Sequence, residues 1–399
     1  MAAIFEIMIK YIDLFAGIGG FHQALKNIGG FECSFASEID KDASMVYKNN
    51  HGLNPKGDIT KIHEKSIPTH DLLCAGFPCQ PFSKSGSQQG FEDIRGTLFF
   101  DIIRIANAHK PKVLLLENVA NISSHDNGNT IKVIRNKLTE IGYNVHSEDL
   151  ILNPIEFGIP VNRPRTFIIA IENSQSFSFT HFYDYLKNKR TPKKTTSIFN
   201  YFNFQENSDI SLQLTDYQKS VLKMWDDFYQ NIDIKTIGFP IWYEYFTKKP
   251  SSFHPQWKKT IITKNNKLYT NNKEYITKWK KEYNHLKWVK PTHKKFEWNC
   301  GESISSVFDG LIQFRPSGVR VKKPDFFSTL VAMNHPQFIG KLNRRLSPKE
   351  CQLLQSFPED FIQHPNEKIA LKQLGNSVNV KLIEILVTSI FHHLNFQES

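Results

Sequence analysis

Four side chains of the sequence could together carry nucleophilic and acid–base chemistry. Cys79 follows an apolar run in the loop GFPCQ, and Glu117 ends another apolar run. A cysteine thiolate is a nucleophile, and a carboxyl group at the mouth of an apolar strand can have a raised pKa and donate a proton. Arg163 and Arg165 stand at alternate positions before a third apolar run, which fits contact with an anion or a carbonyl. Cys79 could instead be a small buried thiol, and Glu117 could be a buried carboxyl group whose hydrogen bonds are satisfied within the protein.

A glycine-rich turn near the start of the chain could bind a nucleoside cofactor. The first apolar run leads into FAGIGG at 15–20, and an amphipathic stretch follows. Glycines let the backbone turn tightly and bring amide groups close to a ligand at a helix N-terminus. Glu38 and Asp40 come about 20 residues later, where such folds place a ribose-binding acid, and Asp58 follows in the next loop. The turn carries no lysine, which argues against a phosphate loop. A purely structural turn is the alternative.

The elements that must position these residues alternate along the first 172 residues. Short apolar runs predict strands at 10–15, 31–36, 71–75, 113–116 and 166–171. Amphipathic stretches predict helices at 20–28, 97–109 and 130–141. This alternation predicts an α/β fold with a mainly parallel sheet and helices on both faces, with the functional loops at the carboxyl ends of the strands. The segment 82–96, rich in Ser, Gly, Gln and charge, has the composition of a mobile lid.

The composition indicates a globular protein of two or three domains with a polyanionic partner. The chain has 399 residues, and its 32 Phe, 13 Tyr and 6 Trp exclude disorder as the main state. Its net charge of +11 points to a polyanion. The five cysteines form no CxxC, so neither a disulfide framework nor a metal site is indicated. No window approaches the ~18 apolar residues of a membrane span, and the start lacks a secretory pattern, so we expect a cytoplasmic location.

The second half of the chain has a different character. Between about residue 185 and residue 300 it is rich in Asn, Lys and aromatic residues, and neither helical nor strand periodicity is clear. A helical pattern returns at 346 and again at 380–393. The stretch 248–295 carries 14 Lys and only two acids, a charge of +12, while the rest of the chain carries −1. Trp and Tyr residues alternate with these lysines, which suits a folded basic surface for DNA; a solvated lysine-rich face is the alternative.

Taken together, these motifs resemble those of the DNA (cytosine-5) methyltransferase family. DLFAGIGG resembles its cofactor loop, GFPCQPFS its nucleophile loop, ENV its acid motif and NRPR its paired-arginine motif. RRLSPKECQLLQSFP and GNSV near the end resemble its last two motifs, and all six follow the family's order between residues 11 and 380. One departure is visible, because Val161 stands where the family usually has Gln, which puts one polar positioning contact in doubt.

The resemblance implies both an architecture and a reaction. It implies a Rossmann-like S-adenosylmethionine-dependent methyltransferase domain at 8–188 plus 373–399, a smaller target-recognition domain at 189–343, and a hinge segment at 344–372. The reaction would transfer a methyl group from S-adenosyl-L-methionine to C5 of a flipped-out cytosine in double-stranded DNA, through a covalent Cys79–C6 intermediate. The expected role is host-DNA protection in a restriction-modification system, beside a cognate restriction endonuclease that acts separately. We expect a monomer that needs no membrane and no metal.

The family's functional residues carry over by motif. The implied catalytic residues are Cys79, Glu117, Arg163 and Arg165. The implied cofactor contacts are Phe15, Gly17, Gly19, Gly20, Asn376, Ser377 and Val378 at the methionine end, Glu38 at the ribose, and Ile39, Phe77, Pro78 and Asp58 at the adenine. The implied DNA contacts are Ser83 and Ser85 at phosphates, Arg315 and Arg320 at guanine edges, and Thr329 of a Thr-Leu pair. Arg315 and Arg320 could equally be ordinary surface residues of strands.

Two other functions fit parts of this pattern. An RNA (tRNA) cytosine-5 methyltransferase would share the catalytic motifs, but the Cys-Phe-Thr segment of that branch is absent, and the long insert favours duplex DNA. A catalytically silent DNA-binding regulator would share the fold, but the intact Cys79, Glu117, Arg163 and Arg165 argue against it.

Overall fold

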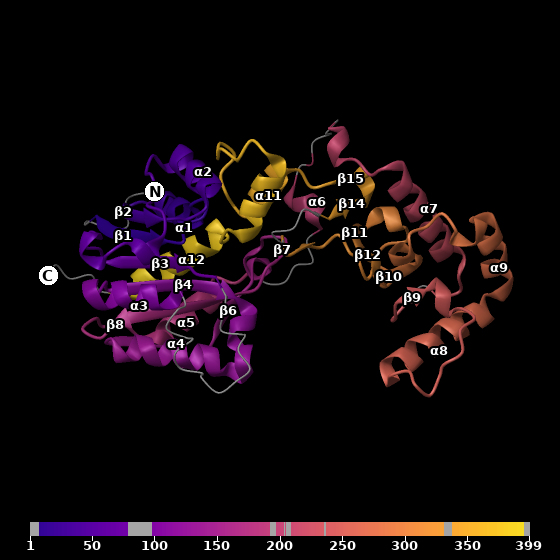
Figure 1. The fold of residues 1–399 in the computed structure, drawn as a ribbon, viewed down its shortest axis with the longest axis horizontal. Coiled ribbons are helices and arrows are strands. Elements are labelled where there is room, and N and C mark those ends of the chain that lie inside the picture. The colour runs from indigo at the N-terminus through magenta and orange to yellow at the C-terminus, as the bar shows by residue number, and fades with distance from the viewer. Residues whose placement is uncertain are drawn as a thin grey trace. The chain divides into compact units, whose positions relative to one another are not determined.

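The computed structural model describes residues 8–78, 98–191, 197–202, 204, 209–234, 237–330 and 337–394, which Figure 1 shows as a ribbon. The chain divides into two compact units. The first unit consists of 1–194, 329–334 and 348–399, and the second consists of 195–328 and 335–347. The chain therefore leaves the first unit twice and returns to it twice.

The first unit is built on one mixed sheet. Its strands are β1 (Ile9–Leu14), β2 (Phe31–Ser37), β3 (Leu72–Gly76), β4 (Val113–Val119), β5 (Tyr143–Val145), β6 (Leu150–Leu152) and β8 (Arg165–Glu172). The strand order is β2-β1-β3-β4-β8-β5, with β6 also paired to β8. The first four strands are parallel, and β8 runs antiparallel to β4, β5 and β6. Because β8 is reversed, its first residue, Arg165, pairs with Val119 at the carboxyl end of β4.

Helices cover both faces of this sheet, as the sequence predicted (Figure 1). The helices in the described part of this unit are α1 (Gly20–Ile28), α2 (Lys41–His51), α3 (Leu98–His109), α4 (Asn129–Glu140), α5 (Phe179–Asn188), α10 (Pro348–Leu354), α11 (Glu367–Asn376) and α12 (Val380–His393). Ile12 and Leu14 of β1 pack into a core with apolar residues of α3 and α4. On the other face, α12 packs against α1 and α5. The predicted α/β fold is therefore confirmed.

The C-terminal stretch 367–393 is apolar enough to resemble a membrane span by length and composition. It is interrupted at Ser377–Asn379, where the side chain of Asn379 caps α12 by accepting the Leu382 N–H. About 72% of its most apolar window is buried inside the protein. These features are those of a core helix in a folded protein.

The second unit contains a separate six-stranded sheet. Its strands are β9 (Ile241–Trp242), β10 (Lys295–Asn299), β11 (Leu311–Arg315), β12 (Gly318–Lys322), β14 (Phe338–Ile339) and β15 (Arg344–Arg345). The order is β15-β14-β11-β12-β10-β9, and only the β10–β12 pair is parallel. Three further elements are short. β7 (Val161–Asn162) belongs to the first unit, and α6 (Ile198–Tyr201) and β13 (Phe327–Ser328) belong to the second.

The second unit also contains three longer helices in a stretch for which the sequence analysis predicted no structure. They are α7 (Asp216–Asn231), α8 (Gln256–Asn271) and α9 (Lys273–Glu282). In α8 the buried residues are only Ile262, Asn265 and Leu268, and one of them is polar. Asn265 is satisfied there because its side chain accepts the Trp242 N–H and donates to the Pro240 carbonyl. A narrow stripe with a polar member gives little apolar periodicity to detect.

Candidate active site

The glycine turn after β1 holds a backbone that most side chains would strain. Phe15, Gly17 and Gly19 have φ values of +57°, +56° and +87°. A Cβ atom on Gly19 would lie 2.3 Å from Nε2 of His51, and one on Gly20 would lie 2.6 Å from Cγ2 of Val378. A side chain at either position would force its neighbour to shift, so contact favours glycine at both, and the positive φ favours it also at Gly19. The turn thereby brings the first motif against Val378 of the last one.

Glu38 follows β2 and is tied to this turn. Its Oε2 accepts the Gly17 N–H at 2.8 Å, and its Oε1 accepts the Asp40 N–H at 2.8 Å. Asp40 in turn caps α2 by accepting the N–H groups of Asp42 and Ala43. Next to this carboxylate, Ile39 is 70% exposed. An acceptor beside an exposed apolar side chain is suited to a sugar hydroxyl and a flat apolar ring, as the sequence predicted.

The other predicted adenine contacts differ in their surroundings. Asp58 is partly buried, and its Oδ1 accepts hydrogen bonds from the hydroxyl and N–H of Thr60, which lower the pKa of its carboxyl group. Phe77 is buried against Phe99, and its carbonyl accepts from the Asn118 side chain at 3.0 Å. Pro78 is exposed at the end of the described segment. The predicted Cys79, Ser83 and Ser85, and the predicted lid 82–96, lie outside the described residues.

Glu117 and Arg165 form a buried ion pair at the carboxyl end of β4. Nε of Arg165 lies 3.0 Å from Oε1 of Glu117, and the two side chains are 14% and 11% exposed. Burial raises the pKa of Glu117, and the positive charges of Arg165 and Arg163 oppose that rise. A carboxyl group with a raised pKa can hold and donate a proton near neutral pH.

The strand that leads to Cys79 meets Glu117 directly. Gly76 ends β3 and pairs with Glu117 in β4. A Cβ atom on Gly76 would lie 3.6 Å from Oε2 of Glu117 and 4.0 Å from Cγ1 of Val378. The acid motif, the last motif and the start of the cysteine loop therefore share one edge of the sheet.

Arg163 does not share the surroundings of Arg165. It is 2% exposed, and its guanidinium donates to three backbone carbonyls: Leu330 at 3.0 Å, Gly375 at 2.8 Å and Ser377 at 2.9 Å. Burial lowers the pKa of Arg163 to about 9. The hydroxyl of Thr329 donates to the Asn162 carbonyl at 2.6 Å beside it. Arg163 thus joins the arginine motif to 329–330 and to the last motif at 375–377.

A buried polar group behind the glycine turn was missed by the sequence analysis. Asp13 of β1 is fully buried, and burial followed by the charge of Glu38 raises its pKa well above the usual range. His22 and His51 stack with ring centroids 4.1 Å apart, and Nδ1 of His22 hydrogen bonds to the Tyr47 hydroxyl at 2.7 Å. Burial lowers the pKa of His22 to about 4 and that of His51 to about 3. The available signal was Asp13 itself, a charged residue inside an apolar run.

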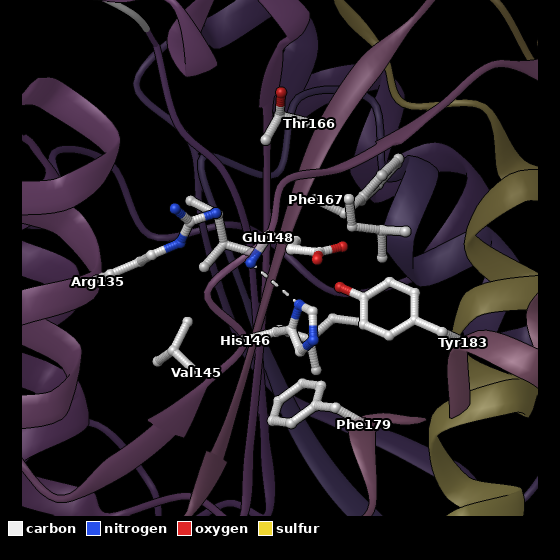
Figure 2. Close-up of a pocket in the computed structure, with 11 residues that line it drawn as sticks. Arg135, Val145, His146, Glu148, Thr166, Phe167, Phe179 and Tyr183 are labelled. Atoms are coloured by element: carbon white, nitrogen blue, oxygen red, sulfur yellow. Dashed lines mark hydrogen bonds between the residues drawn. The ribbon is translucent and has the colours of Figure 1, made fainter. Parts of the chain in front are cut away.

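A small pocket beside β8 is a separate feature. Figure 2 shows His146 between Tyr183 and Phe179, with its Nδ1 accepting the Glu148 N–H at 3.1 Å. The cavity measures about 10 Å³, which is room for about one water molecule. It is too small for a nucleoside, so the candidate cofactor surface is the glycine turn. Within the described residues, no group of three His, Cys, Asp or Glu side chains could hold a metal ion.

The two arginines predicted to read bases lie in the second unit and share one carboxylate. Arg315 and Arg320 approach Glu297 at 2.7 Å and 2.8 Å. Arg320 lies opposite Glu297 in the β10–β12 pair and opposite Gln313 in the β11–β12 pair. The pairing fixes both guanidinium groups on the polar face of the sheet.

Comparisons with known proteins give a consistent picture over the whole chain. A family model described as C-5 cytosine-specific DNA methylase matches residues 9–392. The Type II methyltransferase M.HhaI of Haemophilus parahaemolyticus is 33% identical over 98% of this chain and 96% of that protein. The Type II methyltransferase M.BanI of Aneurinibacillus aneurinilyticus is 33% identical over 96% of each chain.

Solved structures resemble the fold at lower identity. The Dnmt2 methyltransferase of S. pombe matches with a TM-score of 0.56 and 20% identity, over 97% of this chain and 100% of that one. The methyltransferase EhMeth of Entamoeba histolytica matches with a TM-score of 0.53 and 19% identity, over 97% and 99% of the two chains. At this identity the likeness concerns the fold alone.

Proposed function

The chain belongs to the C-5 cytosine-specific DNA methylase family and is a DNA (cytosine-5) methyltransferase, and from this premise we propose how its residues carry the reaction. The first unit is assigned catalysis and cofactor binding, and the second unit is assigned target recognition. The named Type II relatives support a role in protecting host DNA within a restriction-modification system. The expected monomer, the separate endonuclease and the cytoplasmic location stay predictions.

The observation that carries the mechanism is the buried Glu117–Arg165 pair beside the strand that leads to Cys79. C5 of cytosine is a weak nucleophile while the ring is aromatic. Addition of the Cys79 thiolate to C6 pushes an electron pair towards C5 and makes that carbon nucleophilic. Once C5 carries the methyl group, loss of its proton restores the ring double bond and expels the cysteine sulfur.

Glu117 and Arg165 stabilise the charge that this addition creates. The raised pKa of Glu117 lets its carboxyl group keep a proton for N3 of the base, which draws electrons away from C6. Arg165 is fixed on Glu117, so its remaining donors are oriented before the base arrives. We assign them to the base oxygen, where preorganised donors act most strongly. A stacked cytosine cannot reach buried groups, so the base must flip out of the duplex.

The residues of the glycine turn fit S-adenosyl-L-methionine. A Cβ atom on Gly17 would meet no atom within 4 Å, so there is open space at this point of the turn. Glu38 offers carboxylate oxygens to ribose hydroxyls, and Ile39 offers an exposed apolar side chain to adenine. When bound, this cofactor supplies an electrophilic methyl group. The chain's own part is to hold the nucleoside at Glu38 and the methionine end near Gly20 and Val378.

We assign Arg163 a positioning role. The three hydrogen bonds of its guanidinium go to backbone carbonyls, two of them in the last motif. It is therefore placed to fix Gly375–Ser377 against the glycine turn, through the contact of Gly20 with Val378. The base oxygen is left to Arg165. The second unit is assigned sequence reading by Arg315 and Arg320, with Ser83, Ser85 and Thr329 as further DNA contacts.

The test is methyl transfer from a tritiated donor to duplex DNA and, separately, to tRNA, followed by bisulfite sequencing of the DNA. We expect label in DNA, at cytosines of one short sequence. Cys79→Ala should abolish transfer while the protein still binds DNA, and Glu140→Gln, an exposed residue of α4, is the control. Label in tRNA alone would contradict the substrate, and substantial activity of Cys79→Ala would contradict the covalent step.

A further inference from the structure

Aromatic rings orient four lysines around β9, a strand at the edge of the second unit's sheet. Lys295 lies over Trp242 at 4.3 Å, Lys280 over Tyr243 at 5.2 Å and over Tyr269 at 5.3 Å, Lys294 over Tyr243 at 6.0 Å, and Lys248 over Tyr245 at 5.6 Å. Each distance runs from Nζ to a ring centroid. We call these lysines, Lys248, Lys280, Lys294 and Lys295, the β9 lysine cluster.

The β9 lysine cluster is held together by its rings and strands. Trp242 lies opposite Lys295 in the β9–β10 pair, and its ring lies 4.5 Å from that of Tyr245. Tyr243 bridges Lys280 of α9 and Lys294, which precedes β10. The cluster therefore gathers residues from three parts of the chain around one short strand.

The charge of the cluster is not neutralised within the protein. Among the described residues, none of the four ammonium groups has a carboxylate oxygen within 4.0 Å. Glu244 is the one acid between residues 241 and 249, and it is exposed. Glu297, two residues beyond Lys295, is engaged by Arg315 and Arg320. Four lysine ammonium groups thus surround a segment, 241–249, that contains only one acidic residue, Glu244.

An aromatic ring orients an ammonium group without cancelling its charge. A lysine held on a ring has already lost part of its rotamer freedom, so less entropy is lost when an anion binds. A carboxylate partner would orient the side chain too, but it would also have to be displaced by the anion. Rings are therefore the better support for a cation that must meet an external phosphate.

From this geometry we infer that the β9 lysine cluster binds backbone phosphates of duplex DNA, independently of the target sequence. The inference rests on the proposed function, because that function supplies duplex DNA as the partner. Lysine ammonium groups meet phosphates and carry no sequence information, so the cluster strengthens binding to every duplex equally. Its chemical role is distinct from the reading assigned to Arg315 and Arg320.

The experiment compares two variants with the same change in charge. The cluster variant replaces Lys248, Lys280, Lys294 and Lys295 with Gln. The control replaces Lys267, Lys273, Lys278 and Lys287, which are exposed lysines of the same basic stretch and contact neither a ring nor a carboxylate among the described residues. Binding of each protein to a random duplex of about 30 base pairs is measured by fluorescence anisotropy between about 0.05 and 0.3 M NaCl. Circular dichroism melting checks that each variant folds.

The salt dependence decides the outcome. Each phosphate contact contributes about 0.9 to the slope of log K against log salt, so the loss of four contacts should flatten it by about 3.6 in the cluster variant, and the control by less than about 1. The cluster variant should also bind at least about tenfold more weakly at ~0.15 M salt. Equal slopes in the two variants, or a parent that prefers single-stranded RNA to the duplex, would overturn the inference.

Failure of this inference can be told apart from failure of the proposed function. If the parent protein transfers no methyl group to plasmid DNA, the proposed function fails whatever the slopes are. If the parent methylates DNA and the two variants show equal slopes, only the assignment of the cluster fails. In the expected case, the cluster variant methylates the same sequence as the parent, because its lysines contact no bases.

Discussion

Two groups of cations, one in each unit of this protein, are held in opposite ways. In the first unit Arg104 lies on the carboxylates of Glu64 and Asp101, and Arg165 lies on that of Glu117. In the second unit the lysines around β9 lie on aromatic rings. A paired cation positions its neighbours, while an unpaired one remains available to a partner. The comparison therefore separates charge used to build a catalytic site from charge used to bind a polyanion.

The largest expected effect tests the catalytic side of this comparison. Glu117→Gln removes a buried proton donor, and such groups contribute on the order of 100- to 10,000-fold to rate. We expect methyl transfer to fall by that range while the salt slope of DNA binding stays unchanged. Single-turnover transfer and anisotropy titration measure the two quantities. A loss smaller than about tenfold would remove Glu117 from the proton-donor role.

The next effect separates the two arginines of one motif. Arg163→Met removes three hydrogen bonds to the backbone carbonyls of Leu330, Gly375 and Ser377, so the free energy of unfolding should fall by about 3 kcal/mol. Because it loosens the last motif, KM for the methyl donor should rise more than kcat falls. Arg165→Met should show the reverse, with a large fall in kcat.

The conservative variant Arg163→Lys gives the control for this pair. A lysine can reach some of the same carbonyls but cannot reproduce the planar fork of arginine. It should restore part of the stability and part of the affinity for the methyl donor. If Arg163→Met lowered kcat alone and left the melting temperature unchanged, Arg163 would be a base contact and not a positioning residue.

How far the sequence could predict this site depends on the range of the contacts. The glycine turn, Glu38 and Glu117 are local features, because each follows an apolar run that forms a strand, and strand ends meet at one edge of a sheet. The partners of Arg163 lie more than 160 residues away in sequence. Nothing in NRPR itself distinguishes a guanidinium facing a substrate from one facing backbone carbonyls.

The same limit applies to the buried polar residues and to the second unit. His22 lies in a predicted helix and His51 in no predicted element, and only the fold stacks the two rings behind Gly19. The stretch 248–295 showed its charge and its aromatic residues in the sequence, but not that specific rings support specific lysines. The helices α8 and α9 were missed because their buried stripes are narrow, and that of α8 also includes the polar Asn265.

A smaller effect concerns the pH dependence of the first unit. Histidines in the unfolded chain have an ordinary pKa of about 6.5, whereas burial lowers the pKa of His22 to about 4 and that of His51 to about 3 in the folded protein. Between these values the unfolded state binds more protons, so stability falls as the pH drops below 6.5. The raised pKa values of Asp13 and Glu117 act in the opposite direction, since they cost stability as the pH rises.

A variant isolates the histidine contribution from these opposing groups. His51→Gln removes one titrating ring and leaves Asp13 and Glu117 in place. Its melting temperature should fall less than that of the parent between about pH 7 and about pH 5. Differential scanning calorimetry at both pH values measures the difference. An identical fall in both proteins would show that the stacked pair does not set the acid stability.

The smallest expected effect compares one lysine from each unit. Lys137 of α4 lies 2.5 Å from Glu140, an exposed pair of a kind worth less than about 1 kcal/mol. Lys137→Gln should leave both the melting temperature and the salt slope of DNA binding almost unchanged, because the charge of Lys137 is matched by a neighbouring carboxylate.

Lys280→Gln also removes one charge, yet it should flatten the slope by about 0.9, the contribution of one phosphate contact. The two variants have the same net charge, so only the surroundings of the lysine can produce a difference. If both flattened the slope equally, net charge would govern binding, and the contrast between paired and ring-supported cations would have no role in it.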